Sequence, residues 1–163
     1  MKWKIRKGVE TDLEHVLNMV KELAIFEGAP EEVSNTLEMM QSQRDLFDFH
    51  IAEINNHYVG FALYHYTYST WKGKSLYLED LFVRASHRGK GIGSALLNLV
   101  FNVAYNNNCQ RLRWQVLDWN QSAIAFYKKR GATISSEWLN CDFDRNEIEK
   151  IYRNINPSLN LER

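Results

Sequence analysis

The stretch Arg88-Gly89-Lys90-Gly91-Ile92-Gly93-Ser94 decides the fold, because it joins a predicted strand to a predicted helix. Residues 76–83 before it are expected to form the strand. After it, apolar residues recur with the 3.6-residue period of a helix that runs to about Tyr105. Glycines let the backbone take positive φ and approach a ligand closely. Successive N–H groups of such a loop, at the positive end of a helix dipole, predict a diphosphate site.

Two common nucleotide-binding motifs do not match this loop. A Walker loop requires Ser or Thr directly after Gly-Lys, but Gly91 follows Lys90. A dinucleotide fingerprint GxGxxG that starts at Gly91 fails at its third glycine, where Leu96 stands. On this motif alone, a glycine-rich turn that binds no ligand remains an alternative.

The rest of the chain predicts an α/β fold whose sheet has an antiparallel front half and a βαβ back half. Thr11 and Glu14 match a capping box for a helix that Gly28-Ala29-Pro30 ends. Asn55-Asn56 is a hairpin turn signal. The order is β-α-α-β-β-β-α-β-α-β. The expected strands lie near residues 3–6, 47–55, 58–66, 76–83 and 111–117, the further helices near 35–44, 92–105 and 122–129, and a loop at 67–74; two short elements close the chain near 138–143 and 147–152.

Composition favours one soluble domain. The 163 residues are 45% hydrophobic and 25% charged, which is ordinary for a globular protein. A chain of this length buries roughly 70% of the surface that it exposes when unfolded, so we expect one domain over residues 1–163. The net charge of +0 and the pI of about 7.0 argue against bulk attraction to nucleic acid or an anionic membrane, although a local charged patch stays open.

Other features point to a cytoplasmic protein without a metal site. Residues 1–6 lack the apolar run of a signal peptide, and no stretch approaches the ~18 apolar residues of a membrane span. Cys109 and Cys141 have no CxxC or metal-ligand spacing, so two free thiols are the simplest interpretation, with a disulfide as the alternative. The histidines show no metal-ligand spacing either. They are His15, His50, His57, His65 and His87.

The loop also resembles the motif of a known family. Arg88-x-x-Gly91-x-Gly93 is similar to R/Q-x-x-G-x-G/A, the coenzyme A signature of the GNAT acetyltransferase superfamily. Residues 77–83 before it, and residues 120–132 after it, resemble the diamine acetyltransferase branch, the spermidine/spermine N1-acetyltransferases.

Two shorter stretches, residues 69–73 and 116–120, look most like the thialysine-acetylating members of that branch. The similarity runs from the first strand to about Trp138. It implies a GNAT-like acyl-CoA N-acyltransferase fold, acetyl-CoA as cosubstrate and a homodimer. Aromatic side chains that could supply the dimer interface, or equally the core, are Tyr58, Tyr64, Tyr66, Tyr68 and Trp71. The cofactor residues that the resemblance implies are Leu81, Phe82, Val83, Arg88, Gly89, Lys90, Gly91, Ile92, Gly93, Ser94, Asn120 and Tyr127.

Acetyl transfer needs a neutral amine, and a primary amine of pKa about 10.4 is roughly one part in 2,500 neutral at pH 7, a handicap of about 4.6 kcal/mol. The resemblance implies that Glu79 binds the amine and removes its proton, and that Tyr127 is the general acid that protonates the departing thiolate. The residues alone leave Glu79 and Asp80 as exposed charges and Tyr127 as a core aromatic. Because adjacent strand residues face opposite sides, we expect Glu79 and Asp80 not to share one site unless a bulge intervenes.

The amine pocket rests on the same resemblance. Phe26 and Glu27 match an aromatic–acidic pair that receives the cationic substrate, although Glu27 alone reads equally as a solvated helix-end charge. Trp71 is expected to cover the alkyl chain of the substrate, or to anchor its own loop. Ser69 stands where polyamine-specific members carry an acid. This favours a thialysine- or lysine-like amine or a short diamine over a long polyamine.

Asn120 is expected to contact the cofactor, or to be only the N-cap of the next helix. Two functions compete with the small-amine N-acetyltransferase. One is a non-catalytic acyl-CoA-binding module on the same fold. The other is an N-acetyltransferase that acts on a protein N-terminus or a peptide lysine. Glu79 and Tyr127 favour catalysis, because a module that only binds needs neither.

Overall fold

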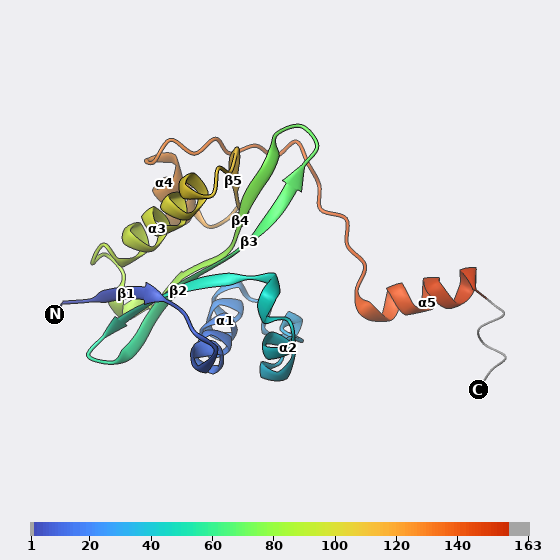
Figure 1. The fold of residues 1–163 in the computed structure, drawn as a ribbon, viewed down its shortest axis with the longest axis horizontal. Coiled ribbons are helices and arrows are strands. Elements are labelled where there is room, and N and C mark those ends of the chain that lie inside the picture. The colour runs from blue at the N-terminus through green and yellow to red at the C-terminus, as the bar shows by residue number, and fades with distance from the viewer. Residues whose placement is uncertain (1, 157–163) are drawn as a thin grey trace. The chain divides into compact units, whose positions relative to one another are not determined.

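A sheet with antiparallel and parallel parts organises the computed structural model, which describes residues 2–156 (Figure 1). Among these residues the strand order is β1-β2-β3-β4-β5, antiparallel up to β4 and parallel between β4 and β5. The predicted antiparallel front half and βαβ back half are confirmed. The strands are β1 (Lys4–Lys7), β2 (Asp48–Ile54), β3 (His57–Ser69), β4 (Gly73–Val83) and β5 (Arg111–Arg113).

Helices cover both faces of this sheet, with α1 and α2 on one side and α3 on the other (Figure 1). Gly28 ends α1 in the left-handed conformation, with φ of 80°, as the Gly-Ala-Pro signal predicts. Among the described residues none of the helices is long and apolar enough to cross a membrane. The helices are α1 (Leu13–Glu27), α2 (Leu37–Ser42), α3 (Ile92–Asn106), α4 (Gln121–Lys128) and α5 (Arg145–Ile155).

The main core lies between α1 and the sheet. Apolar residues at helical spacing on α1, such as Leu13, Val16 and Leu17, pack against alternate residues of the strands, such as Phe49 and Phe61. These side chains are buried. Burying a side chain of this size stabilises the fold by about 1.5–3 kcal/mol, so α1 is held firmly and carries its C-terminal end to a fixed place beside β4.

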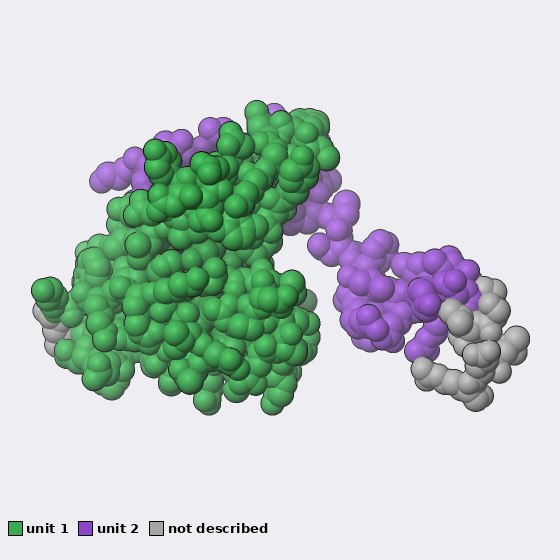
Figure 2. Space-filling model, viewed as in Figure 1, with its two compact units in different colours: residues 1–115 green, residues 116–163 purple. Residues whose placement is uncertain are grey.

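The chain divides into two compact units (Figure 2). Unit 1, Met1–Gln115, holds the whole sheet with α1, α2 and α3. Unit 2, Val116–Arg163, holds α4 and α5, joined by residues that form no regular element.

The predicted capping box at Thr11 and Glu14 is wrong. Residues Glu10–Asp12 form a 3-10 turn before α1. The Asp12 side chain caps this turn, because its carboxylate accepts from the Val9 amide at 2.8 Å. Arg6 donates to both oxygens of the same carboxylate, at 2.6 and 2.8 Å. The Asp12 carboxylate is buried, and the hydrogen bonds from Arg6 stabilise its charged form. They lower the pKa of Asp12 to about 2.

Three strand boundaries also differ from the prediction. The β3–β4 hairpin is longer than expected, so the loop covers residues 70–72 rather than 67–74. β5 ends at Arg113 rather than near 117, because its pairing with β4 stops at Tyr77. The stretch 138–143 has no strand partner among the described residues, and α5 is the last regular element there. The Asn55-Asn56 turn is confirmed, with φ of 49° and 63°.

Candidate active site

The glycine loop has the backbone that the sequence predicts. Gly89 and Gly91 take φ of 75° and 81°, in the left-handed region, and α3 begins directly after Gly91. Gly93 lies in the first turn of α3 with ordinary φ, and a Cβ there would meet only Val83 Cγ2, at 3.7 Å. The first N–H groups of a helix have no partner within the helix. The loop therefore presents backbone donors and the positive end of the α3 dipole to an anion.

Side chains hold this loop in shape. The Arg88 Nε donates to the Val83 carbonyl at 2.8 Å, and the Lys90 ammonium donates to the Ser86 carbonyl at 2.9 Å. Trp3, before β1, donates its indole N–H to the Lys90 carbonyl at 3.1 Å. The Arg88 guanidinium lies over the ring of Phe26, 5.0 Å from its centroid. Phe26 at the end of α1 therefore lies against the glycine loop, and its contact with the amine, which the resemblance implies, stays a prediction.

The β5-side edge of β4 is open at its C-terminal half. β5 pairs with β4 only at Ser75, Leu76 and Tyr77, whereas β3 stays paired with β4 to Val83. Among the described residues, 78–83 of β4 have no strand partner on the β5 side. Backbone N–H and C=O groups on such an edge can pair with another extended chain. This edge and the glycine loop together fit a ligand with an extended amide arm and a diphosphate, which is the chemistry of coenzyme A.

A β-bulge shapes the acidic side of the site. Leu63 of β3 pairs with Asp80, but the next residue, Tyr64, pairs with Leu78, so Glu79 is the extra residue on β4. A bulge re-aims the side chains around it. Asp80 lies on the α1 face beside Leu63, and Glu79, next to it, reaches His65 with 3.3 Å between His65 Nε2 and the carboxylate. This bulge is the exception under which Glu79 and Asp80 are expected to share one site.

Asp80 is the carboxyl group that its surroundings perturb most. Burial, together with the negative charges of Glu79 and Glu27, raises the pKa of Asp80 to about 7. Burial also raises the pKa of Glu27, at the end of α1. Three acidic groups from two elements thus share one electrostatic environment. Such a group, half-protonated near neutral pH, is suited to accept and release a proton.

Two residues at this site are not predicted by the sequence. The alternation of a regular strand turns Asp80 away from Glu79. His65 is one of five histidines without a motif. Only the register of β3 against β4 brings His65 and Glu79 together, and no local sequence signal encodes that register shift.

Trp71 does not join the cluster within one chain. It lies in the three-residue loop between β3 and β4, where the Ser69 hydroxyl accepts from the Trp71 and Lys72 amides. The six residue steps along β4 from Gly73 to Glu79 span about 20 Å. The Trp71 side chain is 81% exposed.

Two predicted site residues belong to unit 2. Asn120 is the N-cap of α4, because its side-chain oxygen accepts from the Ala123 amide at 3.2 Å. Tyr127 on α4 is 8% exposed and packs edge-on against Phe126, with ring centroids 5.3 Å apart. Burial raises the pKa of Tyr127 to about 12, a shift that the Arg130 charge opposes. The phenol therefore keeps its proton at neutral pH, as a general acid must before it acts.

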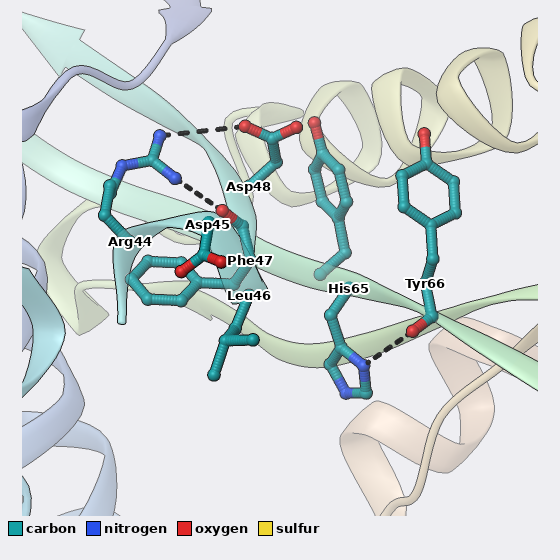
Figure 3. A pocket seen from close by; sticks show the side chains of 8 residues that line it. Arg44, Asp45, Leu46, Phe47, Asp48, His65 and Tyr66 are labelled. Atoms are coloured by element: carbon teal, nitrogen blue, oxygen red, sulfur yellow. Dashed lines mark hydrogen bonds and ion pairs between the residues drawn. The ribbon is translucent and has the colours of Figure 1, made fainter. Parts of the chain in front are cut away.

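A hollow of about 270 Å³ has His65 among its lining residues (Figure 3). In its wall the Arg44 guanidinium pairs with Asp48 at 3.6 Å. Figure 3 shows the His65 ring on the opposite side of β3 from the Tyr66 phenol. His65 both lines the hollow and contacts Glu79. The lining residues are Arg44, Asp45, Leu46, Phe47, Asp48, Tyr64, His65 and Tyr66. Within the described part of the chain, no three His, Cys, Asp or Glu side chains are grouped to hold a metal ion.

Comparison with known proteins gives concordant matches. The profile of the acetyltransferase (GNAT) family matches residues 14–132. The thialysine N-epsilon-acetyltransferase of Mus musculus is 34% identical, over 91% of this chain and 96% of its own length. The enzyme of the same name from Bos taurus is 36% identical, over 82% and 85%. An integron cassette protein from V. cholerae has a similar structure, with a TM-score of 0.75, 25% identity, and coverage of 94% of this chain and 99% of its own.

Proposed function

The chain belongs to the acetyltransferase (GNAT) family and is an N-acetyltransferase, and we propose that it transfers the acetyl group of acetyl-CoA to a primary amine of a small cationic acceptor. The observation that carries this proposal is the β4 bulge. It sets Glu79 and Asp80 side by side, near Glu27, on the strand whose open edge leads to the glycine loop.

Acetyl-CoA would be held by unit 1 through two features. The backbone of residues 89–94 and the Arg88 and Lys90 charges suit its diphosphate. The open edge at Leu81, Phe82 and Val83 suits its amide arm. The cosubstrate supplies a thioester carbonyl for the amine to attack. Asn120, as the N-cap of α4, is a further proposed contact to it.

The carboxylate pair Glu79–Asp80, rather than Glu79 alone, is the proposed proton acceptor. The acceptor enters as an ammonium ion, which the acidic cluster attracts, and its proton passes to the pair. The negative charge of Glu79 is one of the causes that raise the pKa of Asp80. A pKa of about 7 at Asp80 lets that carboxyl take the proton and return it to solvent near neutral pH.

The neutral amine nitrogen attacks the acetyl carbonyl, so a C–N bond forms and the C–S bond breaks. The nitrogen then releases one proton to solvent and becomes the amide nitrogen. The sulfur leaves as a thiolate and takes a proton from Tyr127, the proposed donor, which regains a proton from solvent. Attack occurs directly, with both substrates bound and no acetylated enzyme. Initial-velocity kinetics test this: intersecting lines support a ternary complex, and parallel lines would contradict it.

The proposed acceptor is a lysine-like amine or a short diamine. Glu27, Glu79 and Asp80 provide negative charge close to the reacting amine. Ser69, at the far end of the β3–β4 hairpin, adds none. The relatives that share a third of the sequence are named for thialysine. kcat/KM should therefore be higher for thialysine and lysine analogues than for spermine. A wide preference for spermine would refute this order, and a preference for peptides would favour the protein acetyltransferase.

We also propose that the whole chain acts as one domain, as a homodimer in the cytoplasm. The family match crosses the boundary at Gln115, which supports one domain. Tyr64 is buried and Tyr58 packs against the core and donates to Asp12, so both suit the core better than an interface. Exposed Tyr66, Tyr68 and Trp71 on the hairpin remain interface candidates. A monomer by light scattering at micromolar concentration would contradict the dimer.

A further inference from the structure

His65 and Glu79 meet across two strands. His65 lies on β3 and Glu79 is the bulged residue of β4, with 3.3 Å between His65 Nε2 and Glu79 Oε2. The side chains are 35% and 54% exposed. A contact this exposed contributes about 0–1 kcal/mol to folding even when the imidazole is charged. The contact therefore contributes little to stability. Its main effect is on the orientation of the Glu79 carboxylate.

The imidazole is fixed on its other sides. Its ring packs against Tyr77, with centroids 5.3 Å apart, and the Tyr77 hydroxyl is itself held by the Gln115 side chain at 3.0 Å. The other ring nitrogen, Nδ1, lies 3.4 Å from the Tyr66 carbonyl oxygen. Nε2 faces Glu79, and the two ring nitrogens can donate to both oxygen acceptors when the imidazole is protonated. A side chain whose rotamer is locked in this way can hold its partner in one orientation.

The charged groups around His65 come from several elements. β4 contributes Glu79 and, beyond it, Asp80. Arg44, Asp45 and Asp48 line the hollow on its other side (Figure 3). Arg44 and Asp48 pair with each other, and Lys7 also pairs with Asp48 at 3.1 Å. Of the acidic groups, Glu79 alone lies within hydrogen-bond distance of His65 among the contacts of the described residues.

We infer that His65 is a positioning residue for the acceptor amine. By donating from Nε2 to Glu79, it fixes the orientation of that carboxylate beside Asp80. The inference rests on the proposed function. When one Glu79 oxygen is bound to His65, the other is left for the incoming ammonium, and the negative charge stays on Glu79. The proton that leaves the amine then goes to Asp80. With His65 in place, Glu79 binds the ammonium and Asp80 accepts the proton. His65 itself does not touch the reacting atoms.

Two substitutions separate donation from packing. His65→Phe keeps a ring beside Tyr77 and removes the donor, whereas His65→Gln keeps a side-chain N–H that can reach Glu79. We expect His65→Phe to lower kcat/KM for the amine roughly 10- to 100-fold, because the carboxylate loses its fixed orientation. Most of the loss should appear in the KM of the amine, and His65→Gln should recover much of it. The matched control is His57→Phe, at the opposite end of β3.

A double-mutant cycle tests whether His65 acts through Glu79. In a Glu79→Gln background, His65→Phe should have no further effect on kcat/KM. A full additional loss there, or a His65→Phe variant as active as the wild type, would overturn the inference. The ¹⁵N resonance of His65 Nε2 should also move in Glu79→Gln, and an unmoved resonance would contradict the contact without any assay of activity. Failure of the proposed function looks different: the wild type would then acetylate no amine.

Discussion

Replacing Asp80 by Asn should stabilise the protein at alkaline pH and impair catalysis. The carboxylate is held where burial and the charges of Glu79 and Glu27 disfavour its ionised form, so its pKa is raised from 3.8 to about 7. An amide of nearly the same shape carries no charge. Asp80→Asn therefore removes the penalty of ionisation while it keeps the packing beside Leu63.

The size of the effect follows from the shift in pKa. About three pKa units, at about 1.36 kcal/mol each, correspond to roughly 4 kcal/mol, and partial solvent screening reduces this to about 2–4 kcal/mol. The sign is fixed by linkage. Between pH 4 and pH 7 the folded state binds more protons at Asp80 than the unfolded state, so the free energy of unfolding falls as pH rises through this window.

Denaturant unfolding at pH 8 and at pH 4 measures this. At pH 8 Asp80→Asn should unfold at a higher denaturant concentration than the wild type, and near pH 4 the difference should vanish. Asp142→Asn, in the irregular segment of unit 2, is the control and should change little at either pH. If Asp80→Asn is less stable than the wild type at pH 8, the ionised Asp80 carboxylate does not destabilise the folded state. kcat/KM for the amine should fall about 10²–10⁴-fold in the same variant.

Two further predictions concern the cosubstrate and the general acid. Gly93→Val should weaken acetyl-CoA binding in calorimetry while the fold persists, whereas Gly93→Ala should bind well, because its Cβ meets only Val83 at an ordinary 3.7 Å; equal affinity of both variants would show that the ligand does not approach this turn. Tyr127→Phe should lower kcat about 10²–10⁴-fold with little change in acetyl-CoA affinity, since only the hydroxyl is lost; a nearly full kcat when chemistry limits turnover would make Tyr127 a packing residue.

Local patterns predict the scaffold of this protein well. The glycine loop, the start of α3 after Gly91, the end of α1 at Gly28 and the hairpin turn at Asn55-Asn56 are all encoded by a few neighbouring residues. Positive φ favours glycine and asparagine strongly, so these positions leave a clear signal in the sequence.

The pairing register between strands could not be predicted from the sequence. The bulge at Glu79 depends on how β3 pairs with β4, and an extra residue in one strand does not change the composition of either. The pairing of His65 with Glu79 and the raised pKa of Asp80 both follow from it. The early end of β5 has the same origin in pairing, since a strand ends where its partner's backbone is no longer within reach.

Release of free thiol from acetyl-CoA, measured with and without a lysine-like amine, tests the central proposal most directly. The wild type should release thiol in proportion to amine consumed, and mass spectrometry should find one acetyl group on the amine nitrogen. Thialysine, lysine, a short diamine and spermine make the panel. If the protein binds acetyl-CoA but no member of the panel elicits thiol release or acquires an acetyl group, the small-amine acetyltransferase is contradicted.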